Sequence, residues 1–190
     1  MRGFSLIEMM IGIVLLGALL AMGIPAFNTY GQNAKVLSAA QAFQAMVLQA
    51  RAEAVRLNTD VELVLTDDTD PVAAILSLTG TNIMLRSRLG TPDYSLIETK
   101  SGKEGSASAT GSSTMVTGTL AIIVFKPLGN TNLAALAAFK FTSAANSPAC
   151  VKDGGTIRCL NVEVTPGGQS RLCDPNVVAA DATDSRACST

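Results

Sequence analysis

The sequence contains no histidine and no tryptophan, and aromatic residues make up only 4% of it. Without histidine there is no histidine general base, no histidine-based triad and no mixed cysteine–histidine zinc site. So few aromatic rings argue against base-stacking platforms and aromatic ligand cages. No phosphate-binding loop and no paired nucleophile and base are recognisable, so we expect a protein that is not an enzyme, with no catalytic residue and no cofactor.

Charge is balanced overall and missing from one long stretch. The 14 basic and 15 acidic side chains give a formal net charge of -1, which argues against a generally basic nucleic-acid binder. No charged residue occurs from Met9 to Ala34. The most apolar part, Met9–Phe27, would span about 28 Å as a helix, close to the hydrocarbon thickness of a bilayer. This segment therefore predicts a membrane-spanning helix.

Two features argue against a secretory signal peptide. Glu8 lies at the entrance of the apolar run, and the preceding leader, residues 1–3 (MRG), has only one basic side chain. A carboxylate at mid-membrane costs about 2.5–3.5 kcal/mol and is normally partnered. Removal of residues 1–3 would give Phe4 a new ammonium group, which on a neighbouring copy could pair with Glu8. The pattern favours a helix that forms polymers over a simple anchor.

The segment from Gly3 to Glu8 (GFSLIE), followed by the apolar run, resembles the class III leader of type IV pilins and type II secretion pseudopilins. This resemblance implies cleavage after Gly3 by prepilin peptidase and N-methylation of the Phe4 amine. It also implies that Glu8 acts in assembly and that Pro25 is the family's helix-kinking proline.

An apolar stripe continues the helix beyond the membrane segment. Its members recur at steps of three and four: Val36, Ala40, Phe43, Val47, Ala50, Ala54 and Leu57. Asn58 is a typical stop signal. We expect one helix from Phe4 to about Leu57, kinked near Pro25, whose alanine-rich second half packs on a sheet. A partner-binding coiled coil is the disfavoured alternative.

Short apolar runs follow, separated by turns rich in glycine, proline and aspartate. The strand candidates are Val61–Leu65, Ile83–Leu85, Thr119–Phe125, Ala137–Phe141 and Ile157–Val164. The small residues from Ser101 to Thr114 predict a loop. One helix followed by strands predicts an α+β domain with an antiparallel sheet curved around the helix. The expected division is 1–3 leader, 4–27 transmembrane and polymerisation helix, 28–57 amphipathic half of the helix, and 58–190 globular β-rich domain.

The residues at the end of the predicted helix make the resemblance to the pilins more specific. Residues 50–58 (ARAEAVRLN), followed by an alternating strand, are similar to the GspH/FimT family of minor pilins and pseudopilins, with Ala52 in place of the common serine. The resemblance implies the type IV pilin fold. For Glu53 and Arg56 themselves, the spacing predicts an ordinary i,i+3 ion pair on a solvated helix face.

All four cysteines lie at or after Cys150. An even number in a segment carried across the inner membrane predicts disulfides, for which three pairings are open. Neighbour pairing, Cys150–Cys159 and Cys173–Cys188, is favoured because each bond would staple a loop that contains glycine or proline. No close pair of the CxxC type occurs, so no metal site is expected.

Acidic residues gather just after the helix: Asp60, Glu62, Asp67, Asp68 and Asp70. Their oxygens suit calcium, which some pseudopilins bind, but the spacing is not that of an EF-hand loop. A solvated turn is the favoured interpretation.

Some FimT-like proteins serve DNA uptake through a C-terminal Gly-Arg-x-Arg motif, and residues 168–171 (GQSR) lie at the corresponding place. Gln169 replaces the first arginine, so only Arg171 stays a candidate DNA contact. From Cys150 to Thr190 four bases stand against five acids, too little positive charge to neutralise phosphates. A second basic patch is interpreted as a solubilising surface and consists of Arg86, Arg88, Lys100 and Lys103.

These observations predict a minor type IV pilin, FimU-like, that helps prime pilus assembly and sits at or near the pilus tip. A GspH-like pseudopilin of type II secretion and a FimT-like DNA-binding subunit of natural transformation are the alternatives. Expected partners are other major and minor pilins or pseudopilins, prepilin peptidase and inner-membrane lipid, with DNA disfavoured. The chain would be a single-pass inner-membrane protein with a periplasmic domain, and part of a fibre at the cell surface after assembly.

Overall fold

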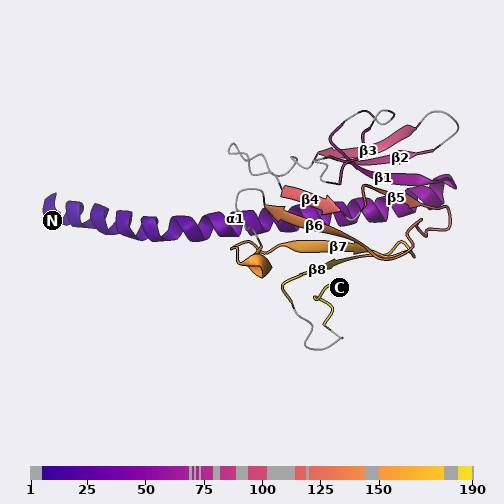
Figure 1. Cartoon of the computed structure of the whole chain (residues 1–190). Coiled ribbons are helices and arrows are strands. Elements are labelled where there is room, and N and C mark those ends of the chain that lie inside the picture. Colours follow the sequence, from indigo (N-terminus) through magenta and orange to yellow (C-terminus); the bar gives the residue numbers. More distant parts are fainter. Residues whose placement is uncertain are drawn as a thin grey trace.

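One long helix and two sheets make up the fold (Figure 1). The computed structural model describes residues 6–68, 70, 72, 74–78, 82–88, 94–101, 114–118, 120–143, 150–177 and 184–189, apart from the side chains of 21–26, 101 and 114–118. The N-terminal half of the helix projects away from both sheets, and its C-terminal half lies along them (Figure 1).

The helix, α1 (Leu6–Leu57), runs without interruption through Pro25. It ends where Asn58 adopts a left-handed φ of 49°. The Thr59 N–H then donates to the Ala54 carbonyl at 3.3 Å and the Asn58 N–H to the Val55 carbonyl at 3.4 Å, the Schellman arrangement that satisfies terminal carbonyls. The predicted helix end is therefore confirmed. Among the described residues, no helix contains a stretch both long and apolar enough to cross a membrane.

The described strands form two antiparallel sheets of four strands each. The first has the order β3-β2-β1-β5 and contains β1 (Val61–Thr66), β2 (Asn82–Ser87), β3 (Ser95–Ser101) and β5 (Ile122–Phe125). The second has the order β4-β6-β7-β8 and contains β4 (Thr114–Gly118), β6 (Ala137–Ser143), β7 (Leu160–Val164) and β8 (Ser170–Cys173). A short 3-10 helix, η1 (Val151–Asp153), precedes β7. The predicted α+β class with antiparallel sheet is confirmed.

Several details differ from the prediction. Two sheets replace the single curved sheet, because β5 pairs with β1 whereas β6 pairs with β4 and β7. The strand expected from Ile157 begins at Leu160, since Ile157 bridges Cys150 instead. The strand expected from Thr119 begins at Ile122. Ser101 and Thr114, the ends of the predicted loop, belong to β3 and β4, and residues 102–113 lie outside the described residues.

The core lies between α1 and the inner faces of both sheets. The predicted stripe is buried from Val36 to Ala54, and Leu57 packs partly against it. At its centre the Phe43 ring lies 4.6 Å from the Phe139 ring and 5.5 Å from the Phe141 ring, measured between centroids, at the separations that aromatic pairs prefer. The stripe thus packs on sheet rather than presenting a coiled-coil surface.

Candidate functional site

The projecting half of α1 is an exposed apolar surface. Every described side chain from Leu6 to Leu20 is exposed, Leu6 by 79% and Leu19 by 72%. Exposed apolar surface of this extent normally marks an interface with lipid or protein. Glu8 is exposed in the first turn, where a negative charge also suits the helix dipole. Gly3 and Phe4 lie outside the described residues.

Two disulfides staple the second sheet. The Cys150–Cys159 bond closes the loop that contains η1, and the Cys173–Cys188 bond joins the end of β8 to the last part of the chain. This is the neighbour pairing favoured in the sequence analysis. We call residues 184–189 the C-terminal strap, because the second bond and a parallel bridge between Asp174 and Ala187 hold them beside β8.

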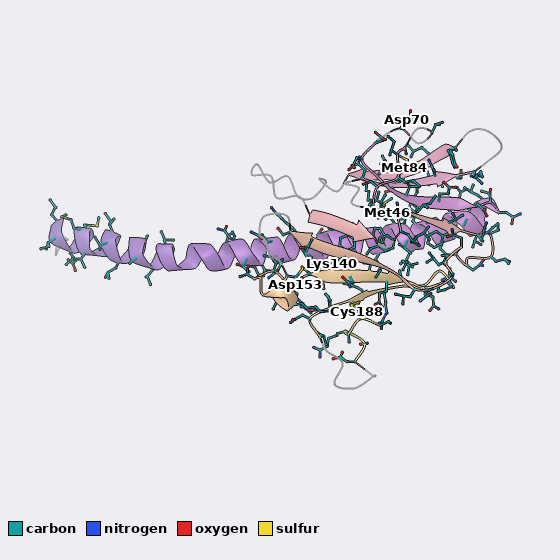
Figure 2. The ribbon with its side chains drawn as sticks, in the orientation of Figure 1. Met46, Asp70, Met84, Lys140, Asp153 and Cys188 are labelled. Carbon is teal, nitrogen blue, oxygen red and sulfur yellow. A yellow bond between two sulfur atoms is a disulfide. The ribbon has the colours of Figure 1, made fainter. Side chains whose placement is uncertain are left out.

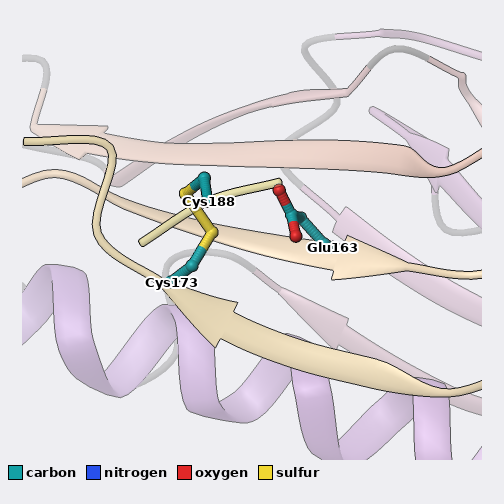
Figure 3. Close-up of side chains that lie close together, drawn as sticks. All are labelled: Glu163, Cys173 and Cys188. Carbon is teal, nitrogen blue, oxygen red and sulfur yellow. A yellow bond between two sulfur atoms is a disulfide. The ribbon is translucent and has the colours of Figure 1, made fainter. Parts of the chain in front are cut away.

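Arg171 and Glu163 hold the same strap in place. Glu163 lies next to the disulfide (Figure 3). Arg171 Nε donates to Glu163 Oε2 at 2.7 Å, and its Nη2 donates to the Ala187 carbonyl at 3.1 Å and to Ser189 Oγ at 2.5 Å. The Ser189 N–H donates to the other Glu163 oxygen at 2.8 Å. The Glu163 side chain is only 1% exposed, and a buried carboxylate needs such partners. Arg171 is therefore committed to a structural network.

An ion pair orders the turn of the strap itself. Arg186 lies 2.9 Å from Asp184, and the Arg186 side chain and backbone N–H hold the pKa of the Asp184 carboxyl below its usual value. Both groups are at the surface, so the pair shapes the turn and contributes little to stability.

Glu163, Cys173 and Cys188 place a carboxylate oxygen and two sulfurs within 4.8 Å of one another (Figure 3). A metal would need the cysteines as thiolates. Here both sulfurs are bonded to each other, and the carboxylate is occupied by Arg171 and Ser189. The cluster is a structural junction and offers no ligand set.

The described residues of the predicted basic patch each interact with a different partner. Arg86 donates to Glu62 at 2.8 Å, and both side chains are buried. Arg88 donates to the Tyr94 hydroxyl at 3.0 Å. Lys100 lies 3.7 Å from Glu98, and Lys103 lies outside the described residues. Neither the described members of this patch nor Arg171 forms a concentrated positive surface of the kind that phosphate binding requires.

The acidic residues after α1 do not converge on a common site either. Asp60 accepts from Lys126 at 2.7 Å and Glu62 pairs with Arg86. Asp68 accepts from the Ile75 N–H at 3.0 Å and Asp70 from the Val72 N–H at 2.8 Å. Carboxylates that cap the N–H groups of their own turn are a common device of aspartate-rich loops. The arrangement favours a structural turn over calcium binding.

A close junction of three distant segments was missed in the sequence analysis. Gly129, in the turn after β5, and Gly168, in the β7–β8 hairpin, approach each other beside the Arg51 side chain of α1. Gly129 has a φ of 79° and Gly168 one of 75°, a region that favours glycine. Glycine-containing turns were visible in the sequence, but nothing in it shows that two of them meet.

Replacing Arg171 with alanine is expected to destabilise the second sheet and release the strap. Removing one partner of a buried pair leaves the other charge uncompensated, at a cost of about 3–5 kcal/mol when both groups are buried. Because Arg171 is 41% exposed, we expect about 2 kcal/mol, measured by thermal unfolding of the full chain in detergent. The matched control is Arg186→Ala, since Arg186 is 72% exposed. Equal stability losses in the two variants would contradict the proposed role of Arg171.

Comparisons with known proteins identify a family model and similar solved structures. The chain matches the type II transport protein GspH family over residues 39–168 and the prokaryotic N-terminal methylation motif over residues 1–24. No curated protein gives a significant match. Among solved structures it is similar to the type IV minor pilin FimU of Pseudomonas aeruginosa, with a TM-score of 0.52 and 13% identity over 75% of this chain and 91% of that chain. It is also similar to the minor pseudopilin EpsH from the type 2 secretion system of Vibrio cholerae, with a TM-score of 0.50 and 14% identity over 75% of this chain and 99% of that chain.

A long helix that begins within a methylation motif and packs on antiparallel sheets, together with the family match, defines a pilin-like structural protein rather than an enzyme. The GspH match covers more than half of the residues, so the chain belongs to the GspH family. It is a minor pilin or pseudopilin of a type IV pilus or a type II secretion system. Membership implies processing by prepilin peptidase, anchoring in the inner membrane before assembly, and assembly with other pilins.

Proposed function

We propose that the protein is a minor type IV pilin that helps to prime pilus assembly and sits at or near the tip of the fibre. Prepilin peptidase cleaves after Gly3, and the new amine of Phe4 is methylated. Glu8 then pairs with the Phe4 ammonium of a neighbouring subunit and sets the axial register. Pro25 kinks the helix as it enters the bundle.

The chain divides by function in this proposal. Residues 1–3 are the leader, 4–27 anchor the subunit in the inner membrane and later enter the helical bundle, 28–57 support the domain, and 58–190 form it. The apolar exposed surface of Leu6–Leu20 supports the second assignment. Burial of that surface between subunits supplies most of the cohesion of the fibre.

The reinforcement of the second sheet is the observation that supports a position at the fibre tip. Two disulfides, together with the Arg171–Glu163 pair, bind the end of the chain to β8. Disulfides persist in oxidising surroundings outside the cytoplasm, and they stabilise a domain that has few neighbours to support it. A subunit at the fibre tip needs this stabilisation more than a subunit that is enclosed in a short periplasmic pseudopilus, which is the alternative role.

Deletion of the coding sequence is expected to abolish surface pili or reduce them sharply, because fibre growth would lack a priming subunit. Pili are counted by electron microscopy in the deletion strain and in the strain complemented with the intact chain. Normal piliation combined with a defect in protein secretion would instead assign the protein to a type II secretion pseudopilus. The described residues offer no observation that favours DNA binding, because Arg171 is engaged by Glu163 and the strap.

A further inference from the structure

The neck of α1, residues 27–37, is the part of the helix that enters the domain, and apolar packing holds it only loosely. Phe27 is 76% exposed and Tyr30 is 73% exposed, and among the described side chains of the helix Val36 is the first that is fully buried. An open pocket of about 290 Å³ lies beside the neck, between Tyr30, Ala34 and Leu37 of α1 and Leu160 and Leu172 of the second sheet. Side chains that line a gap lack contacts on that side, so packing alone leaves the neck room to bend.

A hydrogen bond crosses from the neck to the domain at the edge of this pocket. The backbone N–H of Arg158 donates to Asn33 Oδ1 at 2.8 Å, and both residues line the pocket. We call this hydrogen bond the neck contact. It joins the helix to the segment just before β7, which lies far away in the sequence.

The domain side of the neck contact is rigid. Arg158 lies between Ile157, which is fully buried in the core, and Cys159, which is bonded to Cys150. Its side chain also donates to Asp174 at 2.6 Å. Figure 2 locates this disulfide loop through its labelled residue Asp153, at the end of the domain that faces the projecting half of α1. The donor N–H therefore has a fixed position.

The helix side of the neck contact lies where a small rotation has a large effect. Leu16, in the projecting half, precedes Asn33 by 17 residues, or about 25 Å along the helix. A rotation of about 10° at the neck would move Leu16 by about 4 Å. A single hydrogen bond at Asn33 can therefore determine where the exposed apolar surface lies relative to the domain.

We propose that the neck contact fixes the direction of the projecting half of α1 relative to the domain, and that the Cys150–Cys159 loop positions its donor. With the contact made, the apolar surface and the domain meet neighbouring subunits in one relative orientation, which lowers the conformational cost of association. Without it, the open pocket allows the neck to bend. The inference goes beyond the proposed function and applies equally to a pilus and to a secretion pseudopilus.

Distances between two spin labels test this proposal, measured by double electron–electron resonance on the full chain in detergent micelles. The labels are attached through Leu16→Cys on the projecting half and Thr99→Cys on β3, which Figure 1 shows set apart from the axis of α1. The native cysteines are all bonded in disulfides, so the labels react only with the introduced ones. We expect one main distance, and in Asn33→Leu a displaced population that is about fivefold larger, the effect of losing one hydrogen bond.

Two variants should keep the distance distribution of the unaltered chain. Asn33→Asp retains an acceptor oxygen at the position of Oδ1. Asn28→Leu makes the same change of residue type at an exposed position of the same helix. Bending at Pro25 is common to all these chains, so the differences between them report on the neck contact alone.

Cys150→Ser combined with Cys159→Ser tests the part assigned to the loop. This variant should broaden the distribution as Asn33→Leu does, and adding Asn33→Leu to it should have no further effect, because both changes remove the same contact. Circular dichroism shows whether the domain is folded. If the cysteine variant does not fold, Asn33→Leu still gives the answer, because Asn33 is only half-buried.

The same distribution in Asn33→Leu and in the unaltered chain would overturn the proposal, since other contacts would then hold the neck. So would a distribution in Asn33→Asp as broad as that in Asn33→Leu, because the acceptor oxygen would then be irrelevant. An unchanged distribution in the folded cysteine variant would refute the role of the Cys150–Cys159 loop.

Discussion

Replacing Glu8 with alanine is expected to leave the subunit in the membrane but to reduce its incorporation into pili about a hundredfold. The substitution removes a costly charge from the membrane segment, so insertion should not suffer. Under the proposed pairing, however, it would leave the Phe4 ammonium of the neighbouring subunit buried in the bundle without a partner, at a cost of about 3 kcal/mol, or about two powers of ten in an equilibrium constant. The measurement is the ratio of subunit in sheared pili to subunit in the membrane fraction, by immunoblot.

The matched control for this experiment is Glu53→Ala on the same helix. Glu53 pairs with Arg56 at 2.6 Å on an exposed face, and such pairs contribute little to stability. We expect near-normal incorporation for that variant. If Glu8→Ala assembled as well as Glu53→Ala, the charge pairing between subunits would be wrong, and the register of the bundle would have to come from apolar packing alone.

The elements that could be predicted from the sequence are those fixed by local spacing. Apolar residues in steps of three and four predicted the buried face of α1, and Asn58 predicted where the helix ends. The Glu53–Arg56 pair also forms at the expected spacing. Met46 is also buried on this face but was not included in the stripe. The five strand candidates all contain strand residues, because each has an apolar run of its own.

The strands that were missed lack such a run. β3 (SLIETKS), β4 (TMVTG) and β8 (SRLC) are edge strands, each with no more than two consecutive apolar residues. Their pairing with β2, β6 and β7 depends on neighbours that become available only after the chain has folded. The division into two sheets is likewise a matter of which strands meet, which periodicity does not encode.

The same limit applies to the candidate site. Arg171 matched a motif for DNA contact, yet its partner Glu163 lies in the preceding strand, directly opposite in the β7–β8 register. The buried pair Glu62–Arg86 also joins residues that face each other across two strands. Charged side chains at such positions look like surface residues in a sequence, because only the register shows which of them are buried together.

Replacing Gly168 with alanine is expected to cost about 3 kcal/mol of stability, the largest loss among the substitutions in the domain. Its φ of 75° is unfavourable for any residue with a Cβ, at about 1–2 kcal/mol. The added methyl group would also overlap the Gly129 carbonyl oxygen, and forcing atoms into a packed junction costs a further 1–3 kcal/mol, roughly. Thermal unfolding of the full chain in detergent, followed by circular dichroism, gives the loss.

Gly154→Ala separates the two causes, because Gly154 has a similar φ of 86° but nothing within 4 Å of the position of an added Cβ. It should lose only the backbone part, about 1 kcal/mol. Gly129→Ala should fall between the two, since its added Cβ would lie 3.1 Å from Arg51 Nε and a flexible side chain can move away more easily than a backbone carbonyl. If Gly168→Ala and Gly154→Ala lost the same stability, the contact between the two turns would have no energetic role, and the β7–β8 hairpin would be positioned by its disulfide and the Arg171–Glu163 pair alone.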